Sequence, residues 1–415
     1  MIAGGAFGNR QFARFFVGVF FAVQAIWVQR VTLAWLAWER TGSPGFVGLV
    51  AGLSLAPTIF AGPFFGVMAD RVNIRRAAFA TNGAMAGVLA VLALSLGVVG
   101  AGGVAAAALA IGVVSAAHHP VRMSLGPRLV PRELVVHVIS VTALNFNLAR
   151  LVAPVLAGWI IATAGAGTAL WVAVACYGPM LGILPRLRPR DLPPRPAAPV
   201  LAELREGLRY AGATPVVRQA LVMTFVFATL VRGALEVLPV LADGAFGRGA
   251  AGLGLLTAAA GAGAVTAAIV KALGFLSPPE GIPRTVPAAL LLGFGAVIAM
   301  GLSTHWPFAL AVTGLAGFTA TWVGVSLQAA IQTELPDAYR GRVMSLWTVV
   351  AFGTVSIGAA LIGGLAELSG IGTALALAGG AGLAWFAASW IWGASRAIPS
   401  YLPSRPPPRE EKDGP

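Results

Sequence analysis

The stretch GVMADRVNIRR, residues 66–76, places one acid and three arginines between two long apolar runs. Apolar runs of about 20 residues recur along the chain, and each is long enough to cross a hydrocarbon layer about 30 Å thick as a helix. Of the 415 residues, 58% are hydrophobic and 10% are charged, and the mean hydropathy is +0.84. Because about a quarter of the residues of a soluble protein are charged, this composition predicts a polytopic membrane protein.

The pattern of apolar runs predicts an all-α protein with twelve transmembrane helices. They are expected at residues 12–38, 45–68, 77–99, 102–124, 138–163, 167–185, 217–241, 251–274, 286–303, 307–330, 343–366 and 371–394. The longest polar stretch divides them into an N-terminal six-helix bundle, 1–185, and a C-terminal one, 217–394. The linker between them, 186–216, is expected to be cytoplasmic and to contain an amphipathic helix on the membrane surface, and 395–415 is expected to be a disordered cytoplasmic tail.

Two parts of the chain resemble each other at a constant separation. Pro131 and Pro336 are 205 positions apart, and so are the pairs that begin at Gly167 and Gly372 (336 − 131 and 372 − 167). The repeated stretches lie before and through the fifth and the eleventh predicted spans. Two related halves that rock against each other around a midplane site are typical of secondary transporters, so the sequence predicts two pseudo-symmetric bundles.

The basic residues predict how the chain is oriented in the membrane. Arg40 and Arg248 are the only Lys or Arg expected in loops on one side, and the others fall on the opposite side. By the positive-inside rule, both termini are expected in the cytoplasm and the protein in the inner (plasma) membrane. The net charge of +13 therefore indicates membrane topology, and no binding of nucleic acid is expected.

The charged loop that interrupts the apolar runs resembles the signature loop of the major facilitator superfamily. The residues that match it, one by one, are Gly66, Asp70, Arg71, Arg75 and Arg76. The chain is similar above all to the efflux branch that contains the enterobactin exporter and macrolide-efflux-like proteins. That similarity depends on TGSPGFVGLV at 41–50, LVPREL at 129–134, LREGLRYAGATPVVR at 204–218 and ELPDAYRGRVMSL at 334–346.

The resemblance implies a cytoplasmic gate. In this family the carboxylate equivalent to Asp70 is expected to face the start of the eleventh span, near Gly341 and Arg342, where free backbone N–H groups and the helix dipole favour an anion. Such contacts form only when the cytoplasmic side is shut, so they favour the outward-facing state. The alternative is that these charges only fix the topology.

Four charged residues fall well inside predicted spans, away from the span ends: Arg30, Arg150, Arg232 and Glu236. A charge at the bilayer centre costs at least about 2.5 to 3.5 kcal/mol, so each is expected to face a partner or a wet cavity. Arg232 and Glu236 are four positions apart, a spacing that predicts an ion pair on one helix face. They are the candidates for proton coupling, and a structural pair near the outer mouth is the alternative.

The residues expected to line the substrate cavity are polar, aromatic or charged side chains of the first, fifth and tenth spans. They are Gln24, Trp27, Arg30, Asn147, Arg150, Trp322 and Gln328. For Arg30 the alternative is a side chain that reaches out to the membrane surface. The adjacent His118 and His119 point to different helix faces, so no metal site is expected.

Motifs of ATP-driven pumps and of enzymes are absent from the sequence. It contains no phosphate-binding loop that ends in Gly-Lys-Ser/Thr, no G-x-S-x-G and no H-E-x-x-H, so neither catalysis nor a cofactor is expected. The sequence favours a secondary active transporter that exports a small molecule, such as a drug-like compound, a siderophore or another metabolite, by alternating access in exchange for protons. An uptake carrier of the same fold for an anionic solute and a non-transporting scaffold or receptor are the alternatives. A monomer in the lipid bilayer is expected.

Overall fold

The computed structural model describes residues 5–59, 65, 72–190, 200–274 and 281–395, and all regular elements in this part of the chain are helices. The α-helices are α1 (Arg10–Thr41), α2 (Pro44–Leu55), α4 (Ile74–Ser95), α5 (Ala101–Leu125), α6 (Val135–Ile183), α7 (Val200–Ala213), α8 (Pro215–Phe227), α9 (Gly249–Ala272), α10 (Thr285–Gly301), α11 (Trp306–Glu334), α12 (Asp337–Thr348), α13 (Thr354–Ser369) and α14 (Ile371–Ser395). Three π-helices, η5 (Ala228–Arg232), η6 (Val240–Ala245) and η7 (Val349–Gly353), join some of them, and the 3-10 turns are η1 (Gly5–Gly8), η2 (Gly126–Leu129), η3 (Arg132–Leu134) and η4 (Leu184–Arg186). The predicted all-helical class is confirmed.

Nine of the helical segments in the described residues are long and apolar enough to cross a membrane, and two shorter apolar helices, 44–59 and 285–301, accompany them. The longest of the nine covers 55 residues, 132–186, and includes α6. The backbone of α6 leaves the helical conformation at Gly165, where φ is 81° and ψ is 162°, a region that glycine enters without a steric penalty.

Both arms of α6 contact the same part of α1. Asn145 Nδ2 donates a hydrogen bond to Val19 O at 3.4 Å, and the backbone of Met180 lies against Gly18, where an added Cβ would be 3.0 Å from Met180 Cα. In one straight helix, residues 145 and 180 would be about 50 Å apart. The chain therefore reverses at Gly165, and α6 consists of two antiparallel helices. The count of twelve crossings stays a prediction.

The same reversal occurs again 205 positions later. α13 ends at Gly370, whose φ of 81° and ψ of 155° closely repeat those of Gly165, and α14 begins at the next residue. This separation (370 − 165) equals that of the sequence repeat, so equivalent glycines make equivalent turns in the two halves.

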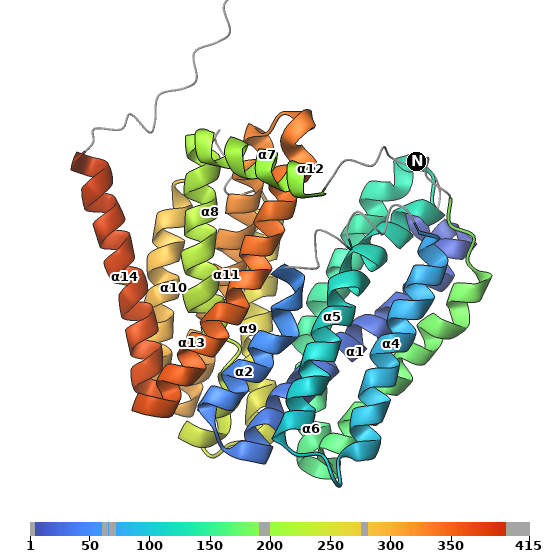
Figure 1. Cartoon of the computed structure of the whole chain (residues 1–415), viewed down its shortest axis with the longest axis horizontal. Coiled ribbons are helices and arrows are strands. Elements are labelled where there is room, and N and C mark those ends of the chain that lie inside the picture. The colour runs from blue at the N-terminus through green and yellow to red at the C-terminus, as the bar shows by residue number, and fades with distance from the viewer. Residues whose placement is uncertain (1–4, 60–64, 66–71, 191–199, 275–280, 396–415) are drawn as a thin grey trace, which may run out of the picture.

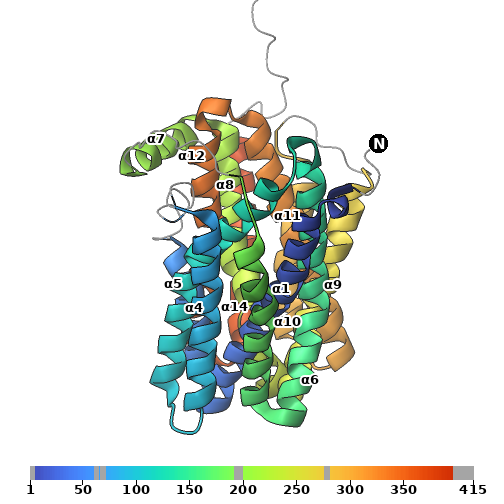
Figure 2. The ribbon, with the colours of Figure 1, turned by 90° about the vertical axis from the view of Figure 1, so that its right-hand side faces the viewer.

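The helices form two groups that lie side by side (Figure 1). One group contains α1, α4, α5 and α6, and the other contains α8, α10, α11, α13 and α14, with α2 and α9 between them. Seen from the side, the long helices run roughly parallel from the end at which α1 begins to the opposite end, called the far end below (Figure 2). α7 lies across the end at which α1 begins and is not aligned with the bundle.

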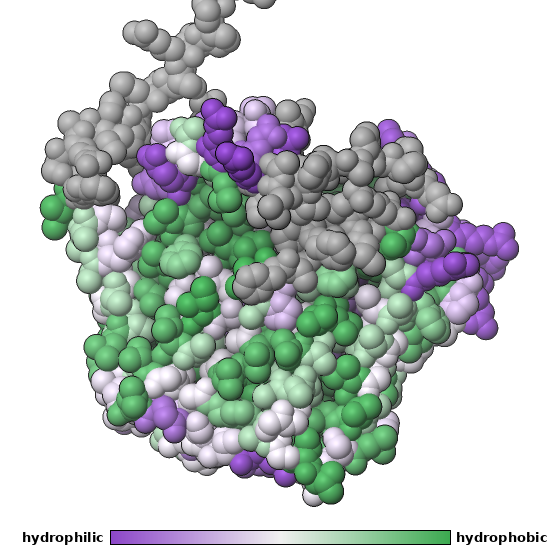
Figure 3. Space-filling model, viewed as in Figure 1, coloured by the Kyte–Doolittle hydropathy of each residue, from purple (hydrophilic) through white to green (hydrophobic). Residues whose placement is uncertain are grey.

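The surface separates into bands, as expected for a protein in a bilayer. Hydrophobic side chains cover the middle of the face shown in Figure 3, while hydrophilic ones gather over α7 and α12 and are fewer at the far end. Apolar side chains in the middle match the hydrocarbon region, and helices satisfy their own backbone hydrogen bonds there.

Glycines bring helices of the two groups into backbone contact near the far end. Gly48 of α2 faces Gly363 of α13, and Gly158 of α6 faces Gly254 of α9. A Cβ built on these four glycines would lie 2.3, 2.6, 2.5 and 2.6 Å, respectively, from a backbone oxygen of the facing helix. Gly158 and Gly363 are again 205 positions apart (363 − 158), so the repeat relates the two contacts, which are called the glycine seams below. Small residues that allow such close approach are typical of helix packing in membranes.

Candidate functional site

An ion pair joins the two groups of helices within the predicted spans, closer to the far end than to the end at which α1 begins. Arg30 lies 11 positions before the end of α1 at Thr41 (41 − 30), about 16 Å along the helix axis, and its guanidinium pairs with the carboxylate of Glu236. The Arg30 side chain is 43% exposed and that of Glu236 is 13% exposed. Arg30 is therefore bonded across to the other half and does not reach the far surface, and its guanidinium faces open space, not dense packing.

The structure does not form the expected pair between Arg232 and Glu236. Arg232 Nη1 donates to Ala351 O at 2.6 Å, and the guanidinium carbon lies 5.0 Å from the ring centroid of Phe352. Arg232 thus binds to η7, while Glu236 binds to α1.

An interruption of the helix explains this difference. A spacing of four residues brings side chains together only on a continuous α-helix. Here residues 228–232 form the π-helix η5, and residues 235–237 are not helical. Pro239 accounts for the break, because it has no N–H to donate and its ring clashes with the carbonyl four residues earlier. π-helical turns at breaks of this kind are common at functional sites.

Trp27 lies between two guanidinium groups. The guanidinium carbons of Arg30 and Arg150 are 5.4 and 5.8 Å from its ring centroid. The ring of Phe146 is 5.7 Å from that of Trp27, and the Arg122 guanidinium lies 5.6 Å from the Phe146 centroid. Cations and rings therefore alternate across α1, α5 and α6, an arrangement that stabilises the cations through the negative faces of the rings.

The charges of Arg30, Arg150, Arg232 and Glu236 act on one another, so these residues together with Trp27 are called the midplane cluster. Arg150 experiences repulsion from Arg232 and Arg30 and attraction from Glu236. Arg30 and Arg150 come from the N-terminal half, and Arg232 and Glu236 from the C-terminal half. Their formal charges sum to an excess of positive charge at the boundary between the halves.

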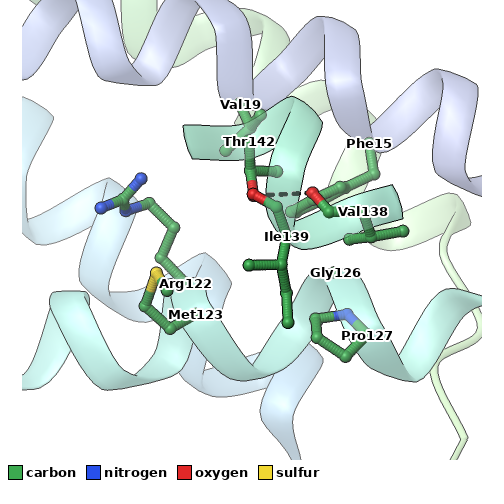
Figure 4. A pocket seen from close by; sticks show the side chains of 9 residues that line it. All are labelled: Phe15, Val19, Arg122, Met123, Gly126, Pro127, Val138, Ile139 and Thr142. Carbon is green, nitrogen blue, oxygen red and sulfur yellow. Dashed lines mark hydrogen bonds between the residues drawn. The ribbon is translucent and has the colours of Figure 1, made fainter. Parts of the chain in front are cut away.

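A cavity lies between α1, α5, η2 and the first arm of α6, closer than the cluster to the end at which α1 begins (Figure 4). Its lining consists of Phe15, Val19, Arg122, Met123, Gly126, Pro127, Val138, Ile139 and Thr142. Arg122 is the charged residue of this lining, and its buried Nε has no hydrogen-bond partner among the residues that the structure describes. The hydroxyl of Thr142 donates to Val138 O at 2.8 Å within its own helix. Arg122 therefore provides the polar group of the cavity that has capacity left for a further partner.

Other predicted cavity residues have local roles in the structure. Asn147 Nδ2 donates to Ala143 O of its own helix at 3.0 Å, and Gln24 and Gln328 are half-buried on α1 and α11. Trp322 is buried, and its described contacts come from the C-terminal half.

Packing within the C-terminal half accounts for the burial of Trp322. Its indole N–H donates to Thr285 Oγ1 at 3.1 Å, its ring stacks on that of Phe318, and Lys271 Nζ lies 4.1 Å from its centroid. α9, α10 and α11 thus enclose it.

Part of the predicted gate motif can be placed. Gly66, Asp70 and Arg71 lie outside the described residues. Arg75 Nη1 donates to Leu187 O at 3.3 Å, at the end of its own half, and Arg76 is exposed. The described part of the motif therefore bonds within the N-terminal half.

The other side of the predicted gate contacts the linker helix. Arg342 Nη1 pairs with Glu206 Oε2 at 2.8 Å, and the rings of Tyr339 and Tyr210 stack with centroids 4.4 Å apart. A Cβ on Gly341 would meet nothing within 4 Å. α7 therefore docks on α12, a contact that the amphipathic pattern of α7 alone does not identify.

Two hydrogen-bonded contacts connect the halves at the far end. Trp38 Nε1 donates to Asp243 Oδ2 at 2.8 Å. Glu367 of α13 accepts from Ser43 Oγ at 2.7 Å and from Gly45 N at 3.0 Å, at the N-terminus of α2, where a helix favours a negative charge. With the glycine seams, these contacts close the far end.

Several of these residues were not predicted as functional from the sequence. Arg122 was counted among the loop arginines that fix topology, and the phenylalanines at 146 and 352 resemble any other apolar residue of a span. Asp243 and Glu367 lie near predicted span ends, where charged residues are common. In the described residues, no group of three or more His, Cys, Asp or Glu is placed to hold a metal ion.

Comparison with known proteins is consistent with this architecture. The family described as "Transmembrane secretion effector" matches residues 5–400. The enterobactin exporter EntS of Shigella flexneri is 30% identical over 247 residues, which cover 58% of this chain and 56% of that protein. EntS of Escherichia coli O1:K1 / APEC is 29% identical over 249 residues, 58% of this chain and 57% of that protein. The chain thus spans little more than half the length of these relatives in the matched region.

Solved transporter structures share the fold of nearly the whole chain. The nucleoside transporter NupG superposes with a TM-score of 0.70 at 12% identity, covering 92% of this chain and 98% of that one. The peptide transporter POT in complex with sulfate gives a TM-score of 0.70 at 16% identity, covering 94% and 95%. Identities this low show the fold alone. By its match to the family over residues 5–400 and by its fold, this chain belongs to the transmembrane secretion effector family of major facilitator transporters.

Proposed function

We propose that the protein is a secondary active exporter, which moves a small molecule out of the cell by alternating access in exchange for protons. The observation that carries this proposal is the ion pair between Arg30 and Glu236, because it connects the two halves within the predicted membrane spans. In transporters built of two repeats, the substrate and coupling-ion sites lie inside the membrane and between the repeats. The exporters among the similar proteins support the direction of transport.

Glu236 is the residue we assign to proton coupling. When its carboxylate takes up a proton, it loses the charge that attracts Arg30, so the contact between the halves weakens. When the proton leaves, the pair forms again. A proton that enters from the far side and leaves to the cytoplasm would therefore drive one cycle of exchange, while the solute moves the opposite way.

The described conformation corresponds in this proposal to the inward-facing state. The glycine seams and the contacts of Asp243 and Glu367 close the far end, which is the outer end if both termini are cytoplasmic. At the opposite end, Arg75 bonds to Leu187 O and Arg342 pairs with Glu206 of the linker helix α7. We expect the gate motif around Asp70 to bind the start of α12 only after the halves have rocked to the outward-facing state.

Replacement of Glu236 by glutamine tests the coupling. Glu236→Gln keeps the size and most hydrogen bonds of the side chain but cannot exchange a proton. We expect efflux of a dye from proteoliposomes to lose its response to an imposed pH gradient, while exchange of labelled for unlabelled dye continues. Dyes of negative, zero and positive charge should be compared, since one class alone could miss the substrate.

Glu39→Gln serves as the matched control, because Glu39 lies on the same helix as Arg30 but close to the end of α1. It should leave the response to the pH gradient unchanged. If the Glu236→Gln protein still concentrates dye in proportion to the pH gradient, Glu236 is not the coupling residue.

A further inference from the structure

The midplane cluster contains more positive charge than its own carboxylate can balance. Glu236 is engaged by Arg30, and Arg232 is satisfied by Ala351 O and by the ring of Phe352. In the described part of the chain, Arg150 has the ring of Trp27 as its contact and no hydrogen-bond acceptor. A cation at this depth requires an anionic partner, a ring or water, so Arg150 has capacity for a further negative group.

Arg150 lies at the boundary between the two halves, where the solute passes in the proposed export cycle. Its backbone lies against α9 of the other half, since a Cβ on Gly261 would be 2.6 Å from Arg150 O. Its side chain extends to α1, where it shares Trp27 with the exposed Arg30. Arg150 therefore lies at the boundary that opens and closes during alternating access.

The surroundings of Arg150 favour a flat ring beside the negative group. Trp27 and Phe146 lie 5.7 Å apart and are flanked by the guanidinium groups of Arg30, Arg150 and Arg122. Indole and phenyl rings pack against a planar solute, and planar guanidinium groups bind carboxylates through paired hydrogen bonds. A cationic solute would instead meet three like charges at this place.

We propose that the solute is an organic anion with a planar ring, and that Arg150 binds its negative group while Trp27 packs against the ring. This inference rests on the proposed export function and specifies its substrate class. Until the solute binds, the carboxylate of Glu236 remains paired with the guanidinium of Arg30.

The experiment measures binding to the purified full-length protein in lipid nanodiscs, with probes that differ from one another in charge or in the planarity of the ring. The probes are 1-naphthoate, the neutral 1-naphthamide and cyclohexanecarboxylate, which keeps the charge but not the planar ring. We expect 1-naphthoate to bind at least about tenfold more tightly than either of the others, because it alone satisfies both groups. Equal affinities for 1-naphthoate and 1-naphthamide would overturn the proposal.

Three variants test the roles of Arg150 and Glu236. Arg150→Gln should remove the preference for 1-naphthoate over 1-naphthamide, and Arg150→Lys should keep part of it. Glu236→Gln should strengthen binding of 1-naphthoate several-fold, because Arg30 loses its internal anion. If the solute were a cation, Glu236→Gln would weaken binding instead, so the sign of this effect decides between the two classes.

Arg248→Gln is the matched control. Arg248 lies 5.6 Å from the ring centroid of Trp306, so it forms the same kind of pair as Arg150 with Trp27, but it lies just before α9, outside the midplane cluster. It should leave all three affinities unchanged. A loss of preference in this variant as large as that in Arg150→Gln would also overturn the assignment.

Failure of this inference is separable from failure of the proposed function. If dyes are exported in response to the pH gradient but 1-naphthoate shows no preference, export stands and the substrate class is wrong. If 1-naphthoate binds as expected but no anion moves across the proteoliposome membrane, the proposed binding site is supported and the proposed export function is wrong.

Discussion

The hydrogen bond from Trp38 to Asp243 connects equivalent positions of the two halves. The two residues are 205 positions apart (243 − 38), the separation of the repeat. Equivalent positions can touch only where the pseudo-symmetry axis passes between them. This contact therefore lies close to the axis about which the halves are related, at the far end of α1.

Removal of the Trp38 donor should shift the equilibrium between conformations. Trp38→Phe keeps a ring but loses the N–H, at a cost of about 1 kcal/mol, which corresponds to a shift of about fivefold toward the state open at the far end. Spin labels on cysteines at Gly97 and Leu302, in a Cys176→Ser background, would report the shift as a larger fraction of long distances. These positions are exposed at the far end of the two halves.

Trp35→Phe is the control for this measurement. Trp35 lies one turn earlier on α1, and its buried Nε1 has no hydrogen-bond partner in the described part of the chain. The same change of side chain should therefore leave the distance distribution as it is. An equal shift in both variants would assign the effect to packing and not to the bond with Asp243.

At the scale of single elements, the seventh predicted span is the one that departs most from a regular helix. Two π-helices, η5 and η6, flank the break at residues 235–237, and Glu236 lies in the break itself. A residue in such a break can change its direction with small rotations of the backbone, whereas a residue inside a helix cannot. This places the proposed coupling residue on the most adaptable part of its span.

The glycine seam between α2 and α13 predicts a clear effect of added volume. Gly363→Val would place a Cβ 2.6 Å from Pro44 O and two methyl groups beyond it, so α2 and α13 must move apart. We expect the spin-label distance between residues 97 and 302 to increase, and efflux to slow because the far end no longer closes.

Gly364→Val provides the matched control on the next residue. A Cβ at Gly364 meets nothing within 4 Å, and the loss of a helical glycine is the same in both variants. Its distance distribution should equal that of the unchanged protein. If Gly363→Val behaves like Gly364→Val, the halves do not need the seam to close.

The elements were largely predictable from the sequence, but their contacts were not. Apolar runs of sufficient length locate the helices, and Gly165 and Gly370 follow from the repeat once the separation of 205 is known. Pro239 is visible in the sequence as the cause of a break, yet the expected pair of Arg232 with Glu236 assumed an unbroken helix. The partner of Glu236, Arg30, is 206 positions away (236 − 30), and no local spacing identifies contacts of that range.

On the scale of the whole molecule, the predicted orientation in the membrane decides which end of the structure faces the cytoplasm. The proposed direction of transport depends on it. Gly97 and Gly212 are exposed glycines whose surroundings leave room for a side chain, the first at the far end and the second on α7. In a Cys176→Ser background, a cysteine at Gly97 should react with a membrane-impermeant maleimide in intact cells. A cysteine at Gly212 should react only in inverted vesicles, as the positive-inside rule requires.

The opposite result has a defined meaning. Labelling of Gly212→Cys in intact cells, without labelling of Gly97→Cys, would reverse the orientation. The described conformation would then be open to the outside, and the proposed exporter would have to be an importer.

Some residues of the candidate site can be predicted from the sequence, and others cannot. Charges such as Arg30, Arg150 and Glu236 stand out because they are costly inside a membrane, and the structure gathers them in one cluster. Trp322 was an equally reasonable candidate, but the fold encloses it among three helices of one half. Whether an aromatic residue faces a cavity or a neighbouring helix depends on helix rotation, which hydropathy does not determine.

The glycine seams also decide what kind of barrier the shut end presents to small ions. At the four glycines the facing surfaces are main-chain atoms, with less room between them than one methyl group would need. Carbonyl oxygens of a helix neither titrate nor change rotamer. The barrier to ions that they form therefore stays the same when the external pH falls. In the proposed exchange cycle, protons would then cross the protein by way of Glu236 and not through the glycine seams.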